Sequence, residues 1–329
     1  MLNPLEKEVA QIDSLGKKEN SVLEKALSLD KVQPNVPSPI EYFKLPSKQQ
    51  LAYTEYGCKS GYPLIYFHDN GSSRLECSFY HHSACKQGYR LIAVDRPGIG
   101  GSTFYPLQSC TQFCQDILLL ADELDLSEFG VLSLGAGGVY GLTLAHMAPD
   151  RVSIQLCLGG VPGTVFNEPD KHSTLSNCVN SIAPSVIKFL VRLKHTLFSE
   201  NVELALRRQQ EYLGYTDRKI LSNPQVFKML ALDQSEVVRQ GGRGVAQDAA
   251  LCFHKLNFSL HDVAVPAQVW QGAADRLSKR SDCEYLVSNL PFANFYRVAN
   301  AGHFFFLQHM DEVLARLQIK TSASVSKAA

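Results

Sequence analysis

Short apolar runs alternate with amphipathic stretches along most of the chain, and this alternation predicts its secondary structure. Runs typical of buried strands occupy residues 63–67, 90–94, 130–134, 152–158, 266–270 and 293–298. Between them lie segments with apolar residues at helical spacing, of which 111–125 is the clearest. Two segments of alternating polarity, 41–45 and 51–56, predict an antiparallel hairpin at one edge. The pattern predicts an α/β fold, with a doubly wound, mostly parallel sheet covered by helices on both faces.

The alternation stops over residues 164–250, where apolar positions recur at helical spacing only. Doubly wound sheets bind ligands at the carboxyl edge of their strands, so an insertion of this kind predicts a helical cap over that edge. The core then comprises residues 39–163 and 251–319. We expect residues 1–38 to form an N-terminal extension with a short amphipathic helix, and residues 320–329 to form a disordered tail.

Composition and charge narrow the expected partners. The 329 residues are 45% hydrophobic, and 32 Lys and Arg balance 32 Asp and Glu. A formal net charge of zero argues against nucleic acid or an anionic membrane as the main partner. No apolar run approaches the roughly 20 residues that span a bilayer. The first residues also lack the apolar core of a signal peptide, so we expect a cytoplasmic protein without a membrane span.

Metal and cofactor signals are missing from the sequence. The nine cysteines are scattered without a C-x-x-C pair, which favours reduced thiols over disulfides or a metal site. The glycines near position 135 lack the spacing of a dinucleotide-binding loop after a first strand. We therefore expect no metal and no cofactor.

The stretch at 129–140, FGVLSLGAGGVY, is the centre of the predicted fold. It predicts a buried strand, a tight glycine turn at 135–138 and a helix that runs to about residue 148. Glycine adopts positive φ at little steric cost, so this turn can be sharper than one built from other residues.

Five segments in this order resemble the α/β-hydrolase superfamily over about residues 40–318. They are HDNGSSR at 68–74, DRPGIGGS at 95–102, the glycine turn, WQGAAD at 270–275 and AGH at 301–303. Each segment is weak evidence alone, and their common order and spacing carry the resemblance. It implies the fold predicted above and, by analogy, a hydrolase activity.

The resemblance implies a nucleophile on the glycine turn, where serine stands in the family's G-x-S-x-G motif. The helix after that serine typically ends in Pro-x-Arg-Val, and here this signature begins at Pro149. In the family this signature lies fourteen to seventeen residues past the nucleophile, and counting back fourteen from Pro149 gives Gly135 as the degenerate nucleophile position. Ser133 would require a two-residue insertion in the helix and would leave Val131 where a small residue belongs. We therefore assign Ser133 a structural role on the strand.

The same resemblance implies the other site residues. Asp275 matches the acid and His303 the base of a catalytic triad, in which the carboxylate orients the imidazole. Backbone N–H groups of Ala136 and of a residue near Asn70 match the oxyanion hole, and His68 opens the same loop.

Three positions on the neighbouring loops carry further expectations. Asp69 replaces the glycine that usually follows the loop histidine, and a carboxylate there opposes negative charge unless it points away. We also expect an ion pair between Arg74 and the segment at 95–96. Asp248 is a candidate cap for the helix that leads out of the inserted segment.

Three hypotheses follow from glycine at position 135. The first is a non-catalytic pseudo-hydrolase that binds a partner or a small hydrophobic or carbonyl-containing ligand under the cap. The second is a hydrolase or lyase in which Asp275 and His303 act as a general base without a covalent intermediate. The third is that the natural sequence has serine at this position. We favour the first, because the serine is missing and Asp69 is unfavourable to an oxyanion.

Overall fold

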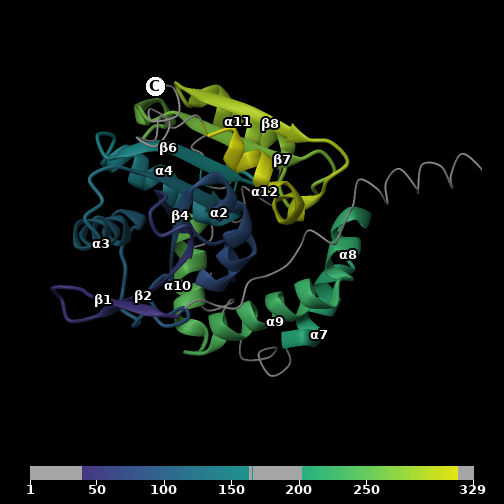
Figure 1. The fold of residues 1–329 in the computed structure, drawn as a ribbon, viewed down its shortest axis with the longest axis horizontal. Coiled ribbons are helices and arrows are strands. Elements are labelled where there is room, and N and C mark those ends of the chain that lie inside the picture. Colours follow the sequence, from purple (N-terminus) through teal and green to yellow (C-terminus); the bar gives the residue numbers. More distant parts are fainter. Residues whose placement is uncertain (1–38, 163–164, 166–201, 318–329) are drawn as a thin grey trace, which may run out of the picture.

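The computed structural model describes residues 39–162, 165 and 202–317, and an eight-stranded sheet runs through them (Figure 1). The strand order is β1-β2-β4-β3-β5-β6-β7-β8, and β1 and β2 are antiparallel to their neighbours, while β3 to β8 run parallel. The strands are β1 (Glu41–Lys44), β2 (Gln50–Gly57), β3 (Tyr62–Phe67), β4 (Tyr89–Val94), β5 (Phe129–Leu134), β6 (Val152–Leu158), β7 (Ala267–Gly272) and β8 (Ala293–Val298). This sheet confirms the predicted α/β class, including the edge hairpin.

Helices cover both faces of the sheet. They are η2 (Arg74–Tyr80), α2 (His81–Gln87), α3 (Cys110–Glu123), α4 (Gly138–Met147), α11 (Arg280–Asn289), η6 (His303–Phe305) and α12 (Phe306–Ala315). Residues of α3, α4 and α11 pack in one apolar cluster, and those of α2 and α12 in another. Successive strand residues alternate between the clusters: Ile65 and Phe67 join the first, and Leu64 and Tyr66 the second. The sheet is therefore buried on both sides, as period-two side-chain alternation requires.

Strand β5 occupies the middle of the sheet, between β3 and β6. All six of its residues are buried, and the chain turns from its end through η3 (Gly135–Gly137) into α4. A Cβ on Gly137 would lie 2.4 Å from the carbonyl oxygens of Phe67 and His68. Glycine is needed there because the loop after β3 crosses the turn at this distance, and so the two loops meet at the carboxyl edge.

Among the described residues between β6 and β7, four α-helices follow one another: α7 (Val202–Gln210), α8 (Tyr215–Leu221), α9 (Pro224–Val238) and α10 (Gly242–Cys252). The 3-10 helix η5 (Leu260–Asp262) follows them. In Figure 1, α7, α8 and α9 lie to one side of the sheet, and α10 leads back toward it. The helix expected at 186–193 lies outside the described residues, as do 1–38 and 320–329. The domain boundaries stay a prediction.

Hydrogen bonds and an ion pair connect helix α9 to the loop after β3. The Asp233 carboxylate accepts hydrogen bonds from the Ser72 and Ser73 hydroxyls, each at 2.5 Å. Gln234 donates to the Gly71 carbonyl, and Glu236 pairs with Arg74 at 2.7 Å. In the described part of the chain, no helix is long and apolar enough to cross a membrane.

Candidate functional site

An aspartate–histidine pair lies at the carboxyl edge of the sheet. Asp275 lies just beyond the end of β7, and His303 opens η6 after β8. The His303 Nδ1 atom lies 3.0 Å from Asp275 Oδ2, and both side chains are buried. The other carboxylate oxygen of Asp275 accepts the backbone N–H groups of Leu277 and Ser278, at 2.7 and 3.0 Å. These bonds fix the carboxylate, which in turn orients the imidazole.

A second carboxylate, from α8, supports the histidine segment from the other side. Asp217 accepts the backbone N–H groups of His303 and Phe304, at 3.0 and 2.9 Å. A Cβ on Gly302 would lie 2.3 Å from the Asp217 carboxylate, so glycine makes this approach possible. Sequence reasoning missed this contact, and no local pattern could have signalled it, because α8 is separated from His303 by more than 80 residues.

The Gly135 turn faces the side chain of Asp69. Gly135 has φ +49°, in the left-handed region. A Cβ at this position would lie 2.4 Å from Asp69 Oδ1, 2.7 Å from Cγ and 2.9 Å from Oδ2. The Asp69 carboxylate therefore occupies the space that a side chain at position 135 would need.

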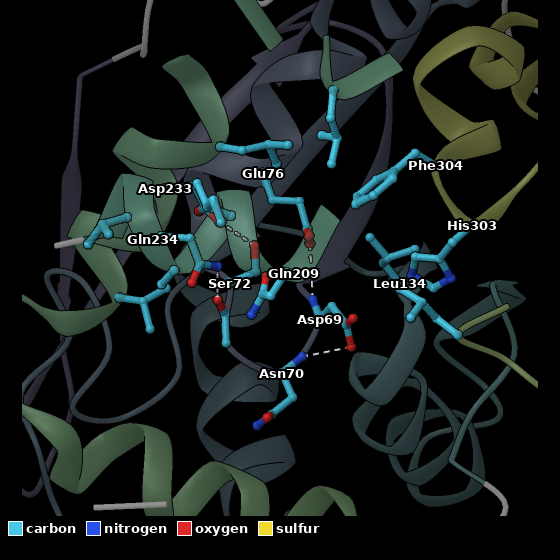
Figure 2. A pocket seen from close by; sticks show the side chains of 18 of the residues that line it. Asp69, Asn70, Ser72, Glu76, Leu134, Gln209, Asp233, Gln234, His303 and Phe304 are labelled. Atoms are coloured by element: carbon cyan, nitrogen blue, oxygen red, sulfur yellow. Dashed lines mark hydrogen bonds between the residues drawn. The ribbon is translucent and has the colours of Figure 1, made fainter. Parts of the chain in front are cut away.

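The Asp69 carboxylate is held by two backbone N–H groups from different loops. Oδ1 accepts a hydrogen bond from the Ala136 N–H and another from the Asn70 N–H, each at 2.7 Å. Figure 2 shows Asp69 beside Asn70 and marks the hydrogen bond from the Asn70 backbone N–H with a dashed line. In the described part of the chain, Oδ2 accepts no hydrogen bond. The Asp69 side chain thus points into the site. The alternative considered from the sequence, that it points away, is wrong.

Burial and neighbouring charges shift the pKa values of Asp69 and His303. Burial raises the pKa of Asp69, while His303 and the N–H groups of Ala136 and Asn70 act in the opposite direction. Burial lowers the pKa of His303, but the hydrogen bond and charge of Asp275, and then the charges of Asp69 and Asp217, outweigh it and leave the pKa raised. His303 therefore lies among three carboxylates that favour its protonated form.

A cavity of about 590 Å³ opens between this edge of the sheet and helices α7, α8 and α9. Figure 2 shows Asp69, Glu76, Asp233 and His303 around it. Its apolar lining includes Leu134, Ala205, Leu206, Leu213, Leu221, Leu230, Val237, Phe304 and Phe306. Burial and neighbouring carboxylates raise the pKa of Glu76 to about 8; burial and, to a smaller extent, Asp95 raise that of Asp233 to about 7. The cavity is thus mainly apolar with an acidic wall.

A buried ion pair fixes the loops behind the site. Arg96 Nε lies 2.6 Å from Asp248 Oδ1. Asp248 Oδ2 accepts a hydrogen bond from the side-chain amide of Asn70 at 2.8 Å. The Arg96 guanidinium also donates to the carbonyls of His68 and Asp69, at 2.7 and 2.9 Å. Asp248 lies inside α10, so the expectation that it caps a helix is wrong: it is a partner of Arg96.

The ion pair expected between Arg74 and the segment at 95–96 is present. Arg74 Nη1 lies 2.5 Å from Asp95 Oδ2, and both side chains are buried. The Asp95 carboxylate also accepts the backbone N–H groups of Arg74 and Gly101, at 2.8 and 2.9 Å. The pair therefore joins the loop after β3 to the loop after β4.

The structure separates the sequence-predicted residues into two groups. Asn70 and His303 line the cavity, while Gly135 and Ala136 adjoin it through Asp69, and Asp275 lies behind His303. The remaining predicted site residue, His68, points elsewhere, as does Ser133, for which a structural role was predicted.

His68 and Ser133 are buried away from the cavity. His68 Nδ1 lies 2.8 Å from the Asp69 carbonyl oxygen, its Nε2 has no partner among the described residues, and burial lowers its pKa. The Ser133 hydroxyl donates to the Leu156 carbonyl at 2.9 Å and accepts from Gln155 at 2.8 Å. The prediction that His68 lies at the pocket is wrong, because its side chain is fully buried and does not line the cavity.

In the described residues, no group of three or more His, Cys, Asp or Glu side chains is arranged to hold a metal ion. The described cysteines are free thiols, and most of them are buried.

Residues 62–310 match the family described as alpha/beta hydrolase fold, and the chain belongs to that family. The protein named "Uncharacterized hydrolase YcgS" of Bacillus subtilis is 25% identical over 232 residues, 68% of this chain and 79% of that protein. A pimeloyl-[acyl-carrier protein] methyl ester esterase of Aromatoleum aromaticum is 26% identical over 227 residues, which are 68% of this chain and 84% of the esterase.

Solved structures agree on the fold. A thermophilic esterase from Thermogutta terrifontis has a TM-score of 0.65 at 17% identity, covering 88% of this chain and 99% of its own. An enol-lactonase from Burkholderia xenovorans has a TM-score of 0.64 at 18% identity, and the match covers 84% of this chain and 97% of the enol-lactonase. At these identities the likeness concerns the fold alone.

Proposed function

We propose that this protein is a pseudo-hydrolase that binds a small hydrophobic or carbonyl-containing ligand and does not perform serine acyl transfer. The observation that carries the proposal is the position of the Asp69 carboxylate. It occupies the side-chain space at Gly135 and accepts both N–H groups that the family resemblance assigns to the oxyanion hole.

Glycine at position 135 removes the group that would form an acyl-enzyme. The turn after β5 supports this register, because Gly135 has positive φ and the next N–H, from Ala136, points to the neighbouring loop. Ser133 cannot take over the role, since its hydroxyl is bonded to the β6 backbone inside the sheet. A strained serine at such a turn costs about 1–3 kcal/mol, and glycine removes that cost.

The Asp69 carboxylate also opposes acyl-transfer chemistry electrostatically. An oxyanion hole lowers the barrier by binding negative charge as it develops. Here the two N–H groups already bind a carboxylate oxygen, so a substrate carbonyl would have to displace Asp69 and then develop charge beside it. Conventional ester or amide hydrolysis is therefore disfavoured at two successive steps.

The cavity supports ligand binding. Its volume of about 590 Å³ lies in the range of pockets that enclose small molecules, and pockets of this kind are mainly apolar with a few polar groups. We propose that α7 to α10 act as a cap, because α7, α8 and α9 supply most of the apolar lining. The ligand would then lie between these helices and His303.

The intact contact between His303 and Asp275, at 3.0 Å, favours one second candidate. In it, His303 acts as a general base toward water or a substrate proton, as a hydrolase or lyase without a covalent intermediate. The relatives named as hydrolases and esterases agree with this candidate in reaction class.

Turnover of short-chain aryl esters and lactones separates the two candidates. The comparison uses the native protein, His303→Ala, and the double variant Asp69→Gly with Gly135→Ser. The proposal expects an inert native protein and measurable turnover by the double variant. Native turnover that disappears in His303→Ala would instead establish His303 as a catalytic base.

Binding of Nile red, a neutral apolar dye, tests the pocket itself. We expect its fluorescence to rise with the native protein and with Leu232→Trp, which places an indole at an exposed position of α9. Ala205→Trp places the same ring in the cavity and should abolish the rise. Equal binding by both tryptophan variants would contradict a ligand site in this cavity.

A further inference from the structure

We propose that the cavity selects an amphiphilic primary amine, whose ammonium group lies against Glu76 and whose hydrocarbon chain lies against α7, α8 and α9. The inference rests on the proposed ligand-binding function and names the class of ligand. It follows from the charges of the cavity wall, from one open oxygen of Glu76 and from the apolar surface opposite.

The described lining of the cavity holds several acids and no Lys or Arg. Its carboxyl groups are Glu76 from η2, Asp233 from α9 and Asp69 from the loop after β3. Within the described part of the chain, none of the three forms an ion pair with a Lys or Arg side chain. His303 is the one basic side chain of the described lining. The wall therefore carries more negative than positive charge.

The arginines behind the cavity do not supply the missing positive charge. Arg74 Nη1 lies 2.5 Å from Asp95 and 2.7 Å from Glu236. Arg96 Nε lies 2.6 Å from Asp248. Both arginines are buried and are held by these partners. Other buried carboxylates of this region are thus paired inside the protein, whereas those at the cavity are left for a cation from outside.

The Glu76 carboxyl presents an open oxygen to the cavity. Its Oε2 accepts hydrogen bonds from the Tyr66 hydroxyl at 2.5 Å and from the Asp69 N–H at 3.0 Å. Its Oε1 accepts no hydrogen bond within the described residues. Glu76 is only 7% exposed and lines the cavity. A polar atom withdrawn from water without a partner costs free energy, so a ligand that donates to Oε1 is favoured.

An ammonium group matches the acceptors on this wall. Figure 2 shows the Glu76 carboxyl directed at Asp69, in agreement with the hydrogen bond between them. Oδ2 of Asp69 is the second oxygen without a hydrogen bond among the described residues. A primary ammonium carries donors and no acceptor, and its bonds to carboxylates are charge-assisted and therefore strong. A carboxylate ligand would be repelled by the same wall.

The opposite wall requires a hydrocarbon chain. Ala205 and Leu206 of α7, Leu221 of α8, and Leu230 and Val237 of α9 line it. A short amine would pair with the carboxyl groups and leave this surface in contact with water, without the gain from apolar burial. The cavity therefore fits an amine with an alkyl or aryl chain.

The pKa of Glu76 agrees with a missing cation. Burial and the charges of Asp233 and Asp69 raise the pKa of this carboxyl to about 8. An ammonium beside Glu76 offsets those charges, so its binding should release a proton near neutral pH. Burial also keeps the neighbouring phenols and thiol neutral, because it raises the pKa values of Tyr66, Tyr80 and Cys77 well above their ordinary values.

The affinity for an amine should therefore rise with pH. Glu76 and Asp233 become charged over this range, and His303, which lines the same cavity, loses its proton. All three changes favour a cation. An alkylammonium stays charged to about pH 10, so the rise should extend from about pH 6 to about pH 8.

Displacement of bound Nile red by octylamine, octanol and octanoate tests the proposal, because the three share one chain. Octylamine should act at a concentration at least about ten-fold below that of octanol, and octanoate should be weakest. Glu76→Gln should weaken octylamine about ten-fold and change octanol by less than about two-fold. Its amide oxygen can still accept from Tyr66 and Asp69, so the change removes charge alone. Glu203→Gln, outside the cavity lining, should leave all three affinities unchanged.

The native protein also tests the proposal without any variant. Its affinity for octylamine should rise between about pH 6 and about pH 8, while that for octanol stays constant. Equal displacement by octylamine and octanol at every pH would overturn the amine proposal and leave the ligand-binding function standing. Equal octylamine affinities in Glu76→Gln and Glu203→Gln would overturn the role of Glu76. Failure of Nile red itself to bind would overturn both proposals.

Discussion

Asp69 and Gly135 compete for one volume at the carboxyl edge of the sheet. The Asp69 carboxylate lies where the Cβ of any other residue at position 135 would be placed, at 2.4 Å from Oδ1. The two positions therefore have to be considered together. Glycine at position 135 leaves room for the Asp69 carboxylate in its present place, and a serine at 135 would force that carboxylate to shift.

This coupling makes a prediction for a double-mutant cycle. Gly135→Ser alone should destabilise the protein by about 2–4 kcal/mol, because it adds both a positive-φ penalty and a steric clash. Asp69→Gly should remove most of the clash, so the double variant should be more stable than the sum of the single changes implies. Urea unfolding of all four proteins measures the coupling; additive changes would contradict the shared volume.

The imidazole of His303 should report on Asp69. The charges of Asp275 and Asp69 both raise the pKa of His303, so Asp69→Asn should lower it. Nuclear magnetic resonance titration of the His303 Cε1 proton gives the value directly. The exposed Glu203→Gln is the control, since Glu203 lies on α7 outside the cavity lining. An unchanged His303 titration in Asp69→Asn would show that the two charges do not interact.

The acidic wall should make stability depend on pH. The folded-state pKa of Glu76 is raised from 4.5 to about 8, and that of Asp233 from 3.8 to about 7. The folded state therefore binds protons more tightly than the unfolded state, and stability falls as pH rises from about 4 to about 8. We expect a loss of several kcal/mol across this window, since one pKa unit corresponds to about 1.4 kcal/mol.

Glu76→Gln should flatten that profile, because it removes one of the two carboxylates whose charges oppose each other. The measurement is urea unfolding at intervals between pH 5 and pH 9. Asp262→Asn serves as the control, because Asp262 is exposed. A native profile that rises with pH over this range would refute the assignment of raised pKa values.

Asp217→Ala should destabilise the histidine segment. It leaves the N–H groups of His303 and Phe304 without their acceptor, and losing bonds to a charged group costs about 1.5–3 kcal/mol. Glu203→Ala, which removes an exposed acid in the first turn of α7, should change stability by less than about 0.5 kcal/mol. Equal effects of the two changes in thermal unfolding would rule out this role of Asp217.

Arg96→Met should be among the most damaging single changes. It leaves Asp248 buried without its cation, and breaking a buried pair from one side typically costs about 3–5 kcal/mol. The carbonyls of His68 and Asp69 lose donors as well. Lys86→Ala breaks the exposed pair with Asp311 and should cost less than about 1 kcal/mol. Comparable losses in the two variants would show that the Arg96 network is dispensable.

The strands and the glycine turn were predictable from sequence because their signals are local. Apolar runs mark the parallel strands, and the register of the turn follows from Gly135 and Pro149 along one stretch of chain. The Asp275–His303 pair was predicted from the family resemblance, and its residues follow two neighbouring strands at the same edge of the sheet. These predictions depend on spacing within one segment or on the order of strands.

The contacts that define the site's chemistry depend on distant segments instead. The direction of the Asp69 side chain is decided by N–H groups on two loops. The partners of Asp217 and Asp248 lie 86 and 152 residues away in sequence. A single sequence shows that Asp69 replaces a glycine, but it does not show that the carboxylate turns inward, because no local pattern encodes that packing.

The attachment of α9 to the loop after β3 couples the inserted helices to the turn at Gly135. Asp233, Gln234 and Glu236 bind the segment that begins at Gly71, two residues beyond Asp69. Any displacement of this helix would therefore also displace the loop that holds the Asp69 carboxylate.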